Sequence, residues 1–447
     1  MTEFIFLVLQ CSQSEGLIPT PSYKPEYKAI QKLTNKLPSK TGGKNEIFSI
    51  IIDAGCWKTR VAVYGFVPSL TGNSLRPKSE FYRSVSPGLS AFAQRPYEGV
   101  HCLDPLLREV QNYIPASKWH ETPLVVMANS GLQRLPLMQI DNLLESARQY
   151  CTRSPFKVGN DSVTVLDSKD EGLLAWFSLN SLLGYLKFSQ EKTAVSIDMG
   201  PDYMQVAFVP KTVGLPNYNS PLYYTDILAY YKTFHVYSRG FWGLGIFEAR
   251  HRILQKEISP NALIFVSSCI SPSIKTVWNY NNTQYSIRGS TDTKYVNIPR
   301  IKGSYRAPVI DTVKCLRVIQ SVIAEFEKPP PSSKRQLYAT GVFYDIVKKI
   351  GLIILKKGAN VELRTILRYA KYKCRDVDFQ NPFLCMDALY VYGLFKYLFD
   401  YPDGEHINIV RTVYGSTVDW TFGAAALNLQ HKVLPRDKFN NRQLNAW

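Results

Sequence analysis

Two short hairpins that share an acidic, glycine-containing turn constrain the fold of this chain more than any other feature. The first turn reads D-A-G-C-W-K-T-R at residues 53–60, and the second reads D-M-G at residues 198–200; apolar segments flank both. Glycine lets the backbone approach a ligand closely, and successive N–H groups of a turn can bind an anion. An aspartate beside them can hold a divalent cation through water. Two such hairpins predict two lobes that face one phosphate.

The size and composition of the chain fit this prediction. Its 447 residues suffice for two or three domains, and 45% hydrophobic with 20% charged residues is typical of a globular protein. No apolar run reaches the roughly 18 residues that a membrane-spanning helix needs. The apolar residues 4–9 are read either as a short signal-peptide core or as an ordinary N-terminus.

The formal charge of +17 permits binding to nucleic acid, acidic membranes or polyphosphate, but it selects none of them. No signature of a nucleic-acid-binding fold is present. A solvated basic face is the favoured interpretation. The densest basic groups are Lys348-Lys349, Lys356-Lys357 and the stretch Arg364, Arg368, Lys371, Lys373 and Arg375.

The eight cysteines are dispersed, without a C-x-x-C pair or a histidine at ligand spacing, which argues against a zinc site. Their spacing leaves two interpretations open. Either several form disulfides in a secretory compartment, or all are reduced thiols in the core.

Apolar periodicity predicts strands that alternate with helices, which is typical of an α/β protein. A helix opened by Pro136 places Ile140, Leu143, Leu144 and Ala147 on one face. Residues 167–172 are expected to lead into a further helix. The other expected elements are strands at 124–128 and 163–166 and helices at 173–186, 247–255, 344–355 and 386–399.

The order of motifs resembles one family, the apyrases or nucleoside triphosphate diphosphohydrolases, which include Golgi nucleoside diphosphatases. Residues 53–60 are similar to its D-A-G-S-S-x-T-R motif, and residues 128–136 to A-T-A-G-L-R-x-L-P. Residues 170–184 resemble E-E-G-x-x-x-W-x-x-x-N-x-L-L-G. Residues 198–205 resemble D-L-G-G-A-S-T-Q, and residues 420–424 resemble W-x-L-G-A.

The resemblance implies an α/β fold of two RNase H-like lobes of the actin, hexokinase and Hsp70 type, with the nucleotide in the cleft between them. Residues 1–44 are expected to be a leader or surface arm. Residues 45–187 and 412–447 are expected to form lobe I, and residues 188–411 lobe II.

The resemblance also implies roles for particular residues. Asp53 and Asp198 would hold Ca²⁺ or Mg²⁺ through water, Glu171 would be the general base, and Gln205 would help to orient the attacking water. The residues expected to bind phosphate are Gly55, Lys58, Thr59, Asn129 and Gly200. Phe343 and Tyr344 lie where the family has an aromatic pair for the nucleobase; the alternative is that they are core residues.

Several positions depart from the family pattern. Cys56 and Trp57 replace two phosphate-binding serines, and Pro201 removes a backbone N–H from the second turn. Asp202 adds negative charge, and Tyr203 replaces the serine that positions the attacking water. The sequence therefore predicts weak or altered hydrolysis of nucleoside di- or triphosphates. The alternative is an inactive pseudo-apyrase that binds nucleotide or another polyanion, or acts as a structural subunit.

The family's cysteine positions imply bridges Cys269–Cys315 and Cys374–Cys385, and hence a location in the secretory pathway, in the Golgi lumen or outside the cell. The expected partner is a nucleoside di- or triphosphate. The basic surface adds an acidic macromolecule as a second expected partner. A nucleic-acid-bound scaffold is a weaker third interpretation, which predicts a steep salt dependence of binding.

Overall fold

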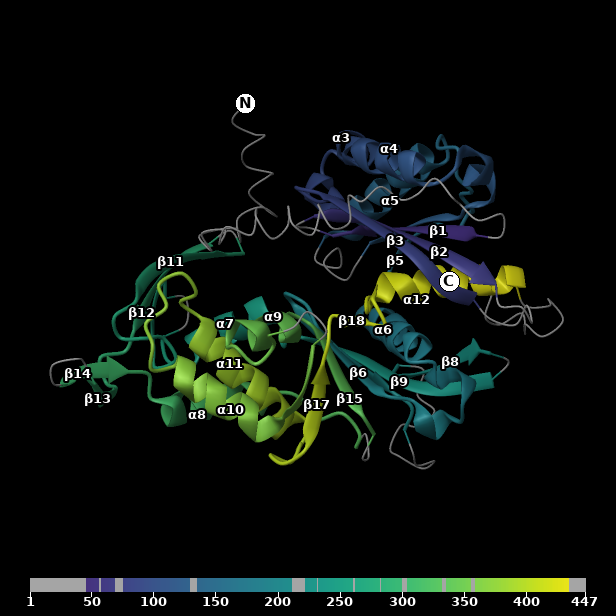
Figure 1. Ribbon diagram of the computed structural model, residues 1–447. Helices are drawn as coiled ribbons and strands as arrows, with labels where there is room; N and C mark the ends of the chain where they lie inside the picture. Colours follow the sequence, from purple (N-terminus) through teal and green to yellow (C-terminus); the bar gives the residue numbers. More distant parts are fainter. Residues whose placement is uncertain are drawn as a thin grey trace.

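The structure is a computed structural model, and the description covers part of the chain (Figure 1). The expected arm 1–44 lies outside the described residues, as do Cys56, Trp57 and Asn129. The described ranges are 46–55, 58–68, 75–128, 135–210, 222–230, 232–259, 262–281, 283–299, 304–331, 335–354 and 358–433.

The first hairpin belongs to a five-stranded sheet with the order β3-β2-β1-β4-β5. β1 pairs antiparallel with β2 and parallel with β4; β2–β3 is antiparallel and β4–β5 is parallel. We call this sheet and the helices on its outer face the first lobe. The strands are β1 (Ile47–Ala54), β2 (Thr59–Pro68), β3 (Leu75–Val85), β4 (Leu124–Ala128) and β5 (Val163–Val165).

The second hairpin belongs to a seven-stranded sheet with the order β16-β17-β15-β6-β7-β9-β8. Its inner strands β9-β7-β6-β15-β17 repeat the order and directions of the first sheet, so the recurrence of the hairpin reflects a duplicated unit. This sheet with α7–α11 is the second lobe. The strands are β6 (Val195–Met199), β7 (Tyr203–Phe208), β8 (Tyr224–Ala229), β9 (Lys232–Trp242), β15 (Leu337–Gly341), β16 (Ala359–Glu362) and β17 (His406–Ile409).

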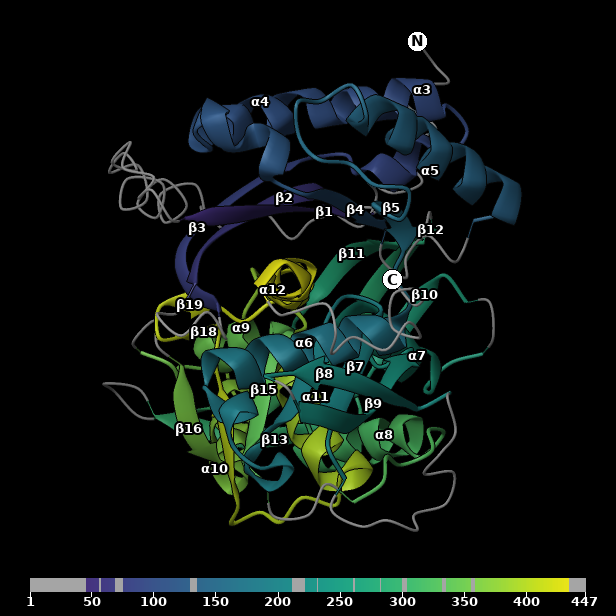
Figure 2. The same cartoon turned by 90° about the vertical axis from the view of Figure 1, so that its right-hand side faces the viewer.

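Two helices lie between the sheets (Figure 2). α12 (Trp420–Val433) packs on β1 and β2, whereas α6 (Ser168–Leu182) packs on β6, β7 and β9 and against α12. A single apolar cluster joins these helices to both sheets, so the lobes share a core at this point. α3 (Pro96–Gly99), α4 (Leu103–Tyr113) and α5 (Leu137–Cys151) cover the outer face of the first sheet.

The outer face of the second sheet is covered by the remaining helices, which enclose the largest apolar cluster. These are α7 (Ile246–Gln255), α8 (Thr312–Ile323), α9 (Val342–Lys349), α10 (Leu363–Lys373) and α11 (Leu384–Gly393). Small sheets extend this lobe: β10 (Ile264–Ser267), β11 (Lys275–Tyr280) and β12 (Thr283–Gly289), then β13 (Lys294–Pro299) with β14 (Ser304–Val309), and β18 (Thr412–Val413) with β19 (Ser416–Thr417).

Several expected helix boundaries were wrong, and the structure gives the physical reason for two of them. α6 begins at Ser168 rather than at Leu173, because the side chain of Asp167 caps the helix by accepting a hydrogen bond of 2.7 Å from the Asp170 N–H. α9 ends at Lys349 rather than at Leu355, since Gly351 follows with a φ of +92°, a backbone conformation that ends a helix.

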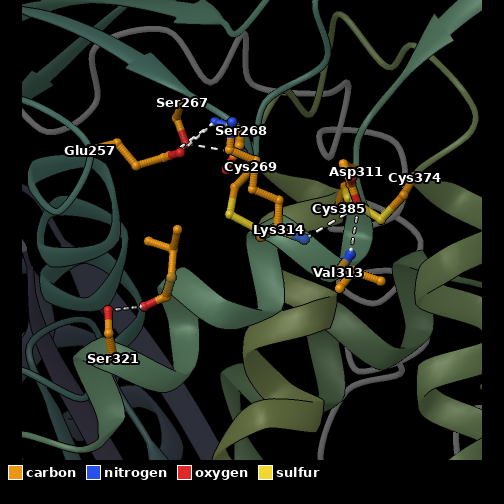
Figure 3. Close-up of a disulfide and its surroundings, with 12 residues drawn as sticks. Glu257, Ser267, Ser268, Cys269, Asp311, Val313, Lys314, Ser321, Cys374 and Cys385 are labelled. Carbon is orange, nitrogen blue, oxygen red and sulfur yellow. Dashed lines mark hydrogen bonds between the residues drawn. A yellow bond between two sulfur atoms is a disulfide. The ribbon is translucent and has the colours of Figure 1, made fainter. Parts of the chain in front are cut away.

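Both disulfides implied by the family resemblance are present. Cys269 joins Cys315 across 46 residues, and Cys374 joins Cys385 across 11 (Figure 3). The first bridge ties the loop after β10 to α8, and the second ties the end of α10 to α11. In the part of the chain that the structure describes, no helix is both long and apolar enough to cross a membrane.

Candidate active site between the two sheets

The two hairpin aspartates occupy equivalent places in the duplicated sheets. Asp53 is the penultimate residue of β1 and lies opposite Arg60, whereas Asp198 is the penultimate residue of β6 and lies opposite Gln205. Strand pairing therefore fixes each carboxylate at the C-terminal end of an interior strand, beside its own turn. Both carboxylates interact electrostatically with Glu171, so the fold brings the two hairpins together around this residue as the sequence predicted.

Glu171 reaches this position because α6 lies unusually close to the second sheet. A Cβ atom on Gly172 would lie 2.8 Å from the Ser238 hydroxyl and 3.1 Å from Cβ of Gln205. The Ser238 hydroxyl donates a hydrogen bond of 2.6 Å to the carbonyl of Lys169, which holds the first turn of the helix against β9. The Gln205 side chain hydrogen-bonds to Glu171. Gly172 thus allows the close packing that brings Glu171, the proposed base, against Gln205, which is expected to orient water.

The carboxylates at this site repel one another. Burial raises the pKa of Glu171 well above its ordinary range, and the charges of Asp53, Asp198 and Asp419 raise it further. Burial likewise raises the pKa of Asp198 to about 6 and raises that of Asp53 above its ordinary range. A cation between the lobes relieves this repulsion, because it favours the charged form of every carboxylate near it.

An ion pair that sequence reasoning missed joins the first hairpin to the start of α12. Arg60 donates hydrogen bonds of 2.7 and 2.9 Å to the two oxygens of Asp419, and its second amino group lies 3.4 Å from Asp53. Burial alone would raise the pKa of Asp419, but the Arg60 guanidinium holds it below its ordinary value. In the sequence, the only indication of this ion pair was Asp419, which directly precedes the motif that begins at Trp420.

A second missed residue supports Asp198. Thr340, in the neighbouring strand β15, is opposite Asp198 in register, and its hydroxyl donates a hydrogen bond of 2.5 Å to Oδ1. Gly341 follows with a φ of +66°, and a Cβ atom there would lie 2.4 Å from the Met199 carbonyl and 2.8 Å from Asp198 Oδ1. Only glycine therefore lets the chain turn away beside this carboxylate.

The residues that were expected to bind phosphate differ in their surroundings. Thr59 is fully buried, and its hydroxyl accepts a hydrogen bond of 2.8 Å from the Leu89 N–H; its contact with phosphate stays a prediction. The Gly200 N–H donates to the Tyr203 carbonyl at 2.9 Å, which leaves it occupied within its own turn. Lys58 is exposed and interacts electrostatically with Asp53, whereas Gly55 is buried where β1 ends.

The substituted second turn lies beside the proposed base. Side chains alternate along a strand, so Tyr203 points to the same face of β7 as Gln205. Its neighbour opposite in β9 is Trp242, whose ring centre lies 5.1 Å from the guanidinium of Arg252 in α7. Hydrogen bonds from the loop after β9 hold the second turn in place. The Gly243 and Gly245 N–H groups donate to the Asp202 carbonyl at 3.0 and 3.2 Å. A tyrosine thus occupies the position at which the family resemblance implies a serine that positions water.

Phe343 and Tyr344 do not offer a nucleobase a free ring in this structure. Phe343 is fully buried and packs against Phe395, and Tyr344 is 2% exposed with the Arg411 guanidinium 4.5 Å from its ring centre. The interpretation of both as core residues, which the sequence left open, is the one that the structure supports.

The residues between the sheets fit a divalent cation held through water. Oxygen ligands are those that Ca²⁺ and Mg²⁺ prefer, and the site offers Asp53 and Asp198 from opposite lobes. Gln205 Oε1 is buried and has no hydrogen-bond partner among the described residues, so it is an unused acceptor beside Glu171. Within the same ranges, no three acidic, histidine or cysteine side chains lie close enough to bind an ion directly.

The raised pKa of Asp198 predicts how stability depends on pH without metal. A carboxyl whose folded pKa exceeds its unfolded value stabilises the protein below about pH 4, and this contribution is lost as pH rises through about 6. Between pH 4 and 7, Asp198→Asn should therefore gain on the order of 2 kcal/mol relative to the native chain.

Urea unfolding at several pH values in EDTA checks this. The exposed Asp141→Asn, on α5, is the matched control and should track the native chain. A relative stability of Asp198→Asn that stays constant or falls with pH would contradict the expected repulsion.

Comparison with known proteins agrees with this geometry. Residues 39–441 match the model of the GDA1/CD39 (nucleoside phosphatase) family. Human ectonucleoside triphosphate diphosphohydrolase 6 is 29% identical over 406 residues, which cover 88% of this chain and 79% of that protein. The human nucleoside diphosphate phosphatase ENTPD5 is 28% identical over 389 residues, covering 86% and 88%. The crystal structure of nucleoside triphosphate hydrolases from Neospora caninum superposes with a TM-score of 0.62 at 12% identity, covering 92% and 96%.

The duplicated sheets, with two helices between them and a carboxylate site where the lobes meet, define a two-lobed protein of the actin, hexokinase and Hsp70 fold. Within that class the chain belongs to the GDA1/CD39 nucleoside phosphatase family. Members of this family generally depend on a divalent cation, and nucleoside di- and triphosphates fit the family as substrates.

Proposed function

We propose that this chain hydrolyses the terminal phosphate of nucleoside di- or triphosphates with Ca²⁺ or Mg²⁺, at a rate reduced by its altered turns. The observation that carries the proposal is the position of Glu171. This carboxyl is buried among the carboxylates of both lobes and hydrogen-bonded to Gln205. A structural acid at the start of a helix needs none of these partners, whereas a general base that works beside bound phosphate and metal needs a positioned water and an ionised state.

The residues of the chain divide the chemistry between them. Glu171 accepts a proton from the attacking water, and the free Oε1 of Gln205 accepts a hydrogen bond that orients that water. Asp53 and Asp198 hold the water shell of the cation, which supplies charge neutralisation for the terminal phosphates when bound. Arg60 and Thr340 keep the two aspartates in place.

The reduced rate is inferred from the phosphate-binding turns. Pro201 has no N–H, and the Gly200 N–H is already bonded within its turn, so the second hairpin offers phosphate fewer donors. Removing one preorganised donor typically costs ~100-fold or more in rate.

The direct test is phosphate release from ATP, ADP, GDP and UDP by the purified protein, with Ca²⁺, with Mg²⁺ and with EDTA. Release that depends on metal is expected for at least one nucleotide. Failure of well-folded protein to release phosphate from any of them with either ion would contradict the proposal.

An inactive nucleotide-binding protein is the second candidate. It is favoured by the same loss of donors and by Tyr203, whose ring lies on the face of β7 that carries Gln205. In that case nucleotide with metal should raise the melting temperature although no phosphate is released. An acidic macromolecular partner remains a proposal that rests on the charge of +17.

Tyr203→Ser provides a sharper test of the altered turn. Removing the ring beside Gln205 and restoring a small hydroxyl should raise kcat for the preferred nucleotide by about 10-fold or more, because a positioned donor is returned to the site. Steady-state phosphate release measures this. Tyr97→Ser, 72% exposed on the first lobe, is the control and should change nothing. A lower kcat in Tyr203→Ser would mean that the tyrosine itself takes part in catalysis.

The two disulfides support a location in the secretory pathway or outside the cell, because such bonds persist in oxidising compartments. Recovery of both bridges by non-reducing peptide mapping of protein from its native source is expected; free thiols at all four positions would contradict this location.

A further inference from the structure

A row of cations runs along the solvent-facing side of α10. Arg364, Arg368, Lys371 and Arg375 are all exposed, and no acidic residue occurs between Leu363 and Arg375. Arg364, Arg368 and Lys371 lie on α10 at spacings of four and three residues, which places them within an arc of about 60° over a length of about 10 Å. Arg375 follows in the turn after the helix, which ends at Lys373. We call these four residues the basic row.

The basic row is not needed to hold α10 in place. The opposite face of the helix anchors it, since Leu363, Ile366 and Ala370 are buried in the core of the second lobe. Like charges three and four residues apart destabilise a helix by about 0.2–0.5 kcal/mol per pair. The two such pairs within α10, Arg364 with Arg368 and Arg368 with Lys371, therefore destabilise the helix rather than stabilise it.

Interactions with neighbouring groups neutralise only part of the positive charge of the basic row. Arg364 pairs with Glu362 at 2.8 Å, and cations in the last turn favour the helix dipole. Arg368, Lys371 and Arg375 form no ion pair with any carboxylate in the described part of the chain. Two acids follow the row, Asp376 and Asp378. Asp376 is exposed and, among the described residues, forms no ion pair with the row, and Asp378 accepts hydrogen bonds from the N–H groups of Gln380 and Asn381. The row therefore presents uncompensated positive charge.

The row is also rigid and remote from the proposed active site. The Cys374–Cys385 disulfide fixes the end of α10 to α11, directly beside Arg375. Figures 1 and 2 both place α10 on the side of the second lobe that faces away from the first lobe. Tyr372, which is 61% exposed, adds an amphipathic ring beside the cations.

We propose that the basic row is a binding site for a sulfated polysaccharide, a linear polyanion of oxidising compartments. Arginine forks match oxyanions such as sulfate in a bidentate way, and a straight row of cations complements an extended chain of anions. The disulfides favour an oxidising compartment over the cytosol and the nucleus, which makes nucleic acid the poorer partner; this step rests on the location proposed above. Anionic lipids concentrate on the cytoplasmic leaflet, which also makes a membrane the poorer partner.

The test is the affinity of the full-length protein for a sulfated oligosaccharide derived from heparin, measured by calorimetry over a range of salt. Arg368→Gln/Lys371→Gln/Arg375→Gln should weaken binding by about 10-fold or more. It should also flatten the slope of log Kd against log salt by about 2, as expected when three anion contacts are lost. Arg368→Lys/Arg375→Lys keeps the charge and should retain most of the slope.

A matched triple variant distinguishes binding at the basic row from a general effect of the net positive charge. Arg108, Arg153 and Lys157 are exposed on the first lobe, so Arg108→Gln/Arg153→Gln/Lys157→Gln removes the same three charges and should bind normally. Equal weakening by both triples would overturn the proposal. Binding to phosphatidylserine vesicles or to desulfated oligosaccharide, but not to the sulfated one, would overturn it too. Phosphate release should stay unchanged and the melting temperature should not fall in either triple, which verifies folding.

Discussion

Glu171→Gln should lower metal-dependent phosphate release by about 100- to 10,000-fold, the usual contribution of a positioned general base. The substitution keeps the shape of the side chain and its contact with Gln205 but removes the group that accepts the proton. Steady-state kinetics with the preferred nucleotide measure the loss, which should fall on kcat rather than on KM.

Asp170→Asn is the matched control for this experiment. Asp170 lies in the same first turn of α6, so the variant removes one negative charge from the same end of the helix dipole. Asp170 is not among the charges that act on Glu171, and its loss should change kcat only a few-fold. Equal losses in both variants would mean that Glu171 acts through the helix and not as a base.

A second readout concerns stability. Because burial and the neighbouring carboxylates disfavour the charged form of Glu171 in the metal-free protein and raise its pKa, Glu171→Gln should melt at the same temperature as the native chain or higher at neutral pH in EDTA. A markedly lower melting temperature would point to a structural role for this carboxyl.

Removing the Cys269–Cys315 bridge with Cys269→Ala/Cys315→Ala should cost about 4 kcal/mol of unfolding free energy. Removing Cys374–Cys385 in the same way should cost about 3 kcal/mol. The difference follows from loop length, because a bridge across 46 residues restricts the unfolded chain more than one across 11. Guanidinium unfolding without reductant measures both.

Cys102→Ala is the control for the disulfide variants, since Cys102 forms no bridge and is only partly buried. It should shift the unfolding midpoint little. Reducing the native protein should reproduce the loss caused by both double variants together. A larger cost for the shorter bridge would contradict the chain-entropy explanation.

The sequence by itself determined the features that depend on local chemistry. Apolar segments on both sides of two D-x-G turns predicted the strands that carry Asp53 and Asp198, and their recurrence predicted the duplicated lobes. The family resemblance implied both disulfides, which the structure contains. These predictions succeeded because strand periodicity, turn residues and cysteine positions are written in consecutive residues.

Tertiary structure alone decided which partners the site residues have. Arg60 meets Asp419 across 359 residues of sequence, and the buried Thr59 hydroxyl accepts a hydrogen bond from the Leu89 N–H. Phe343 and Tyr344 could be assigned to the core only once the helices around them were packed. The physical reason is that a short turn permits several side-chain directions, and the elements that pack against it, which come from distant parts of the chain, select one of them.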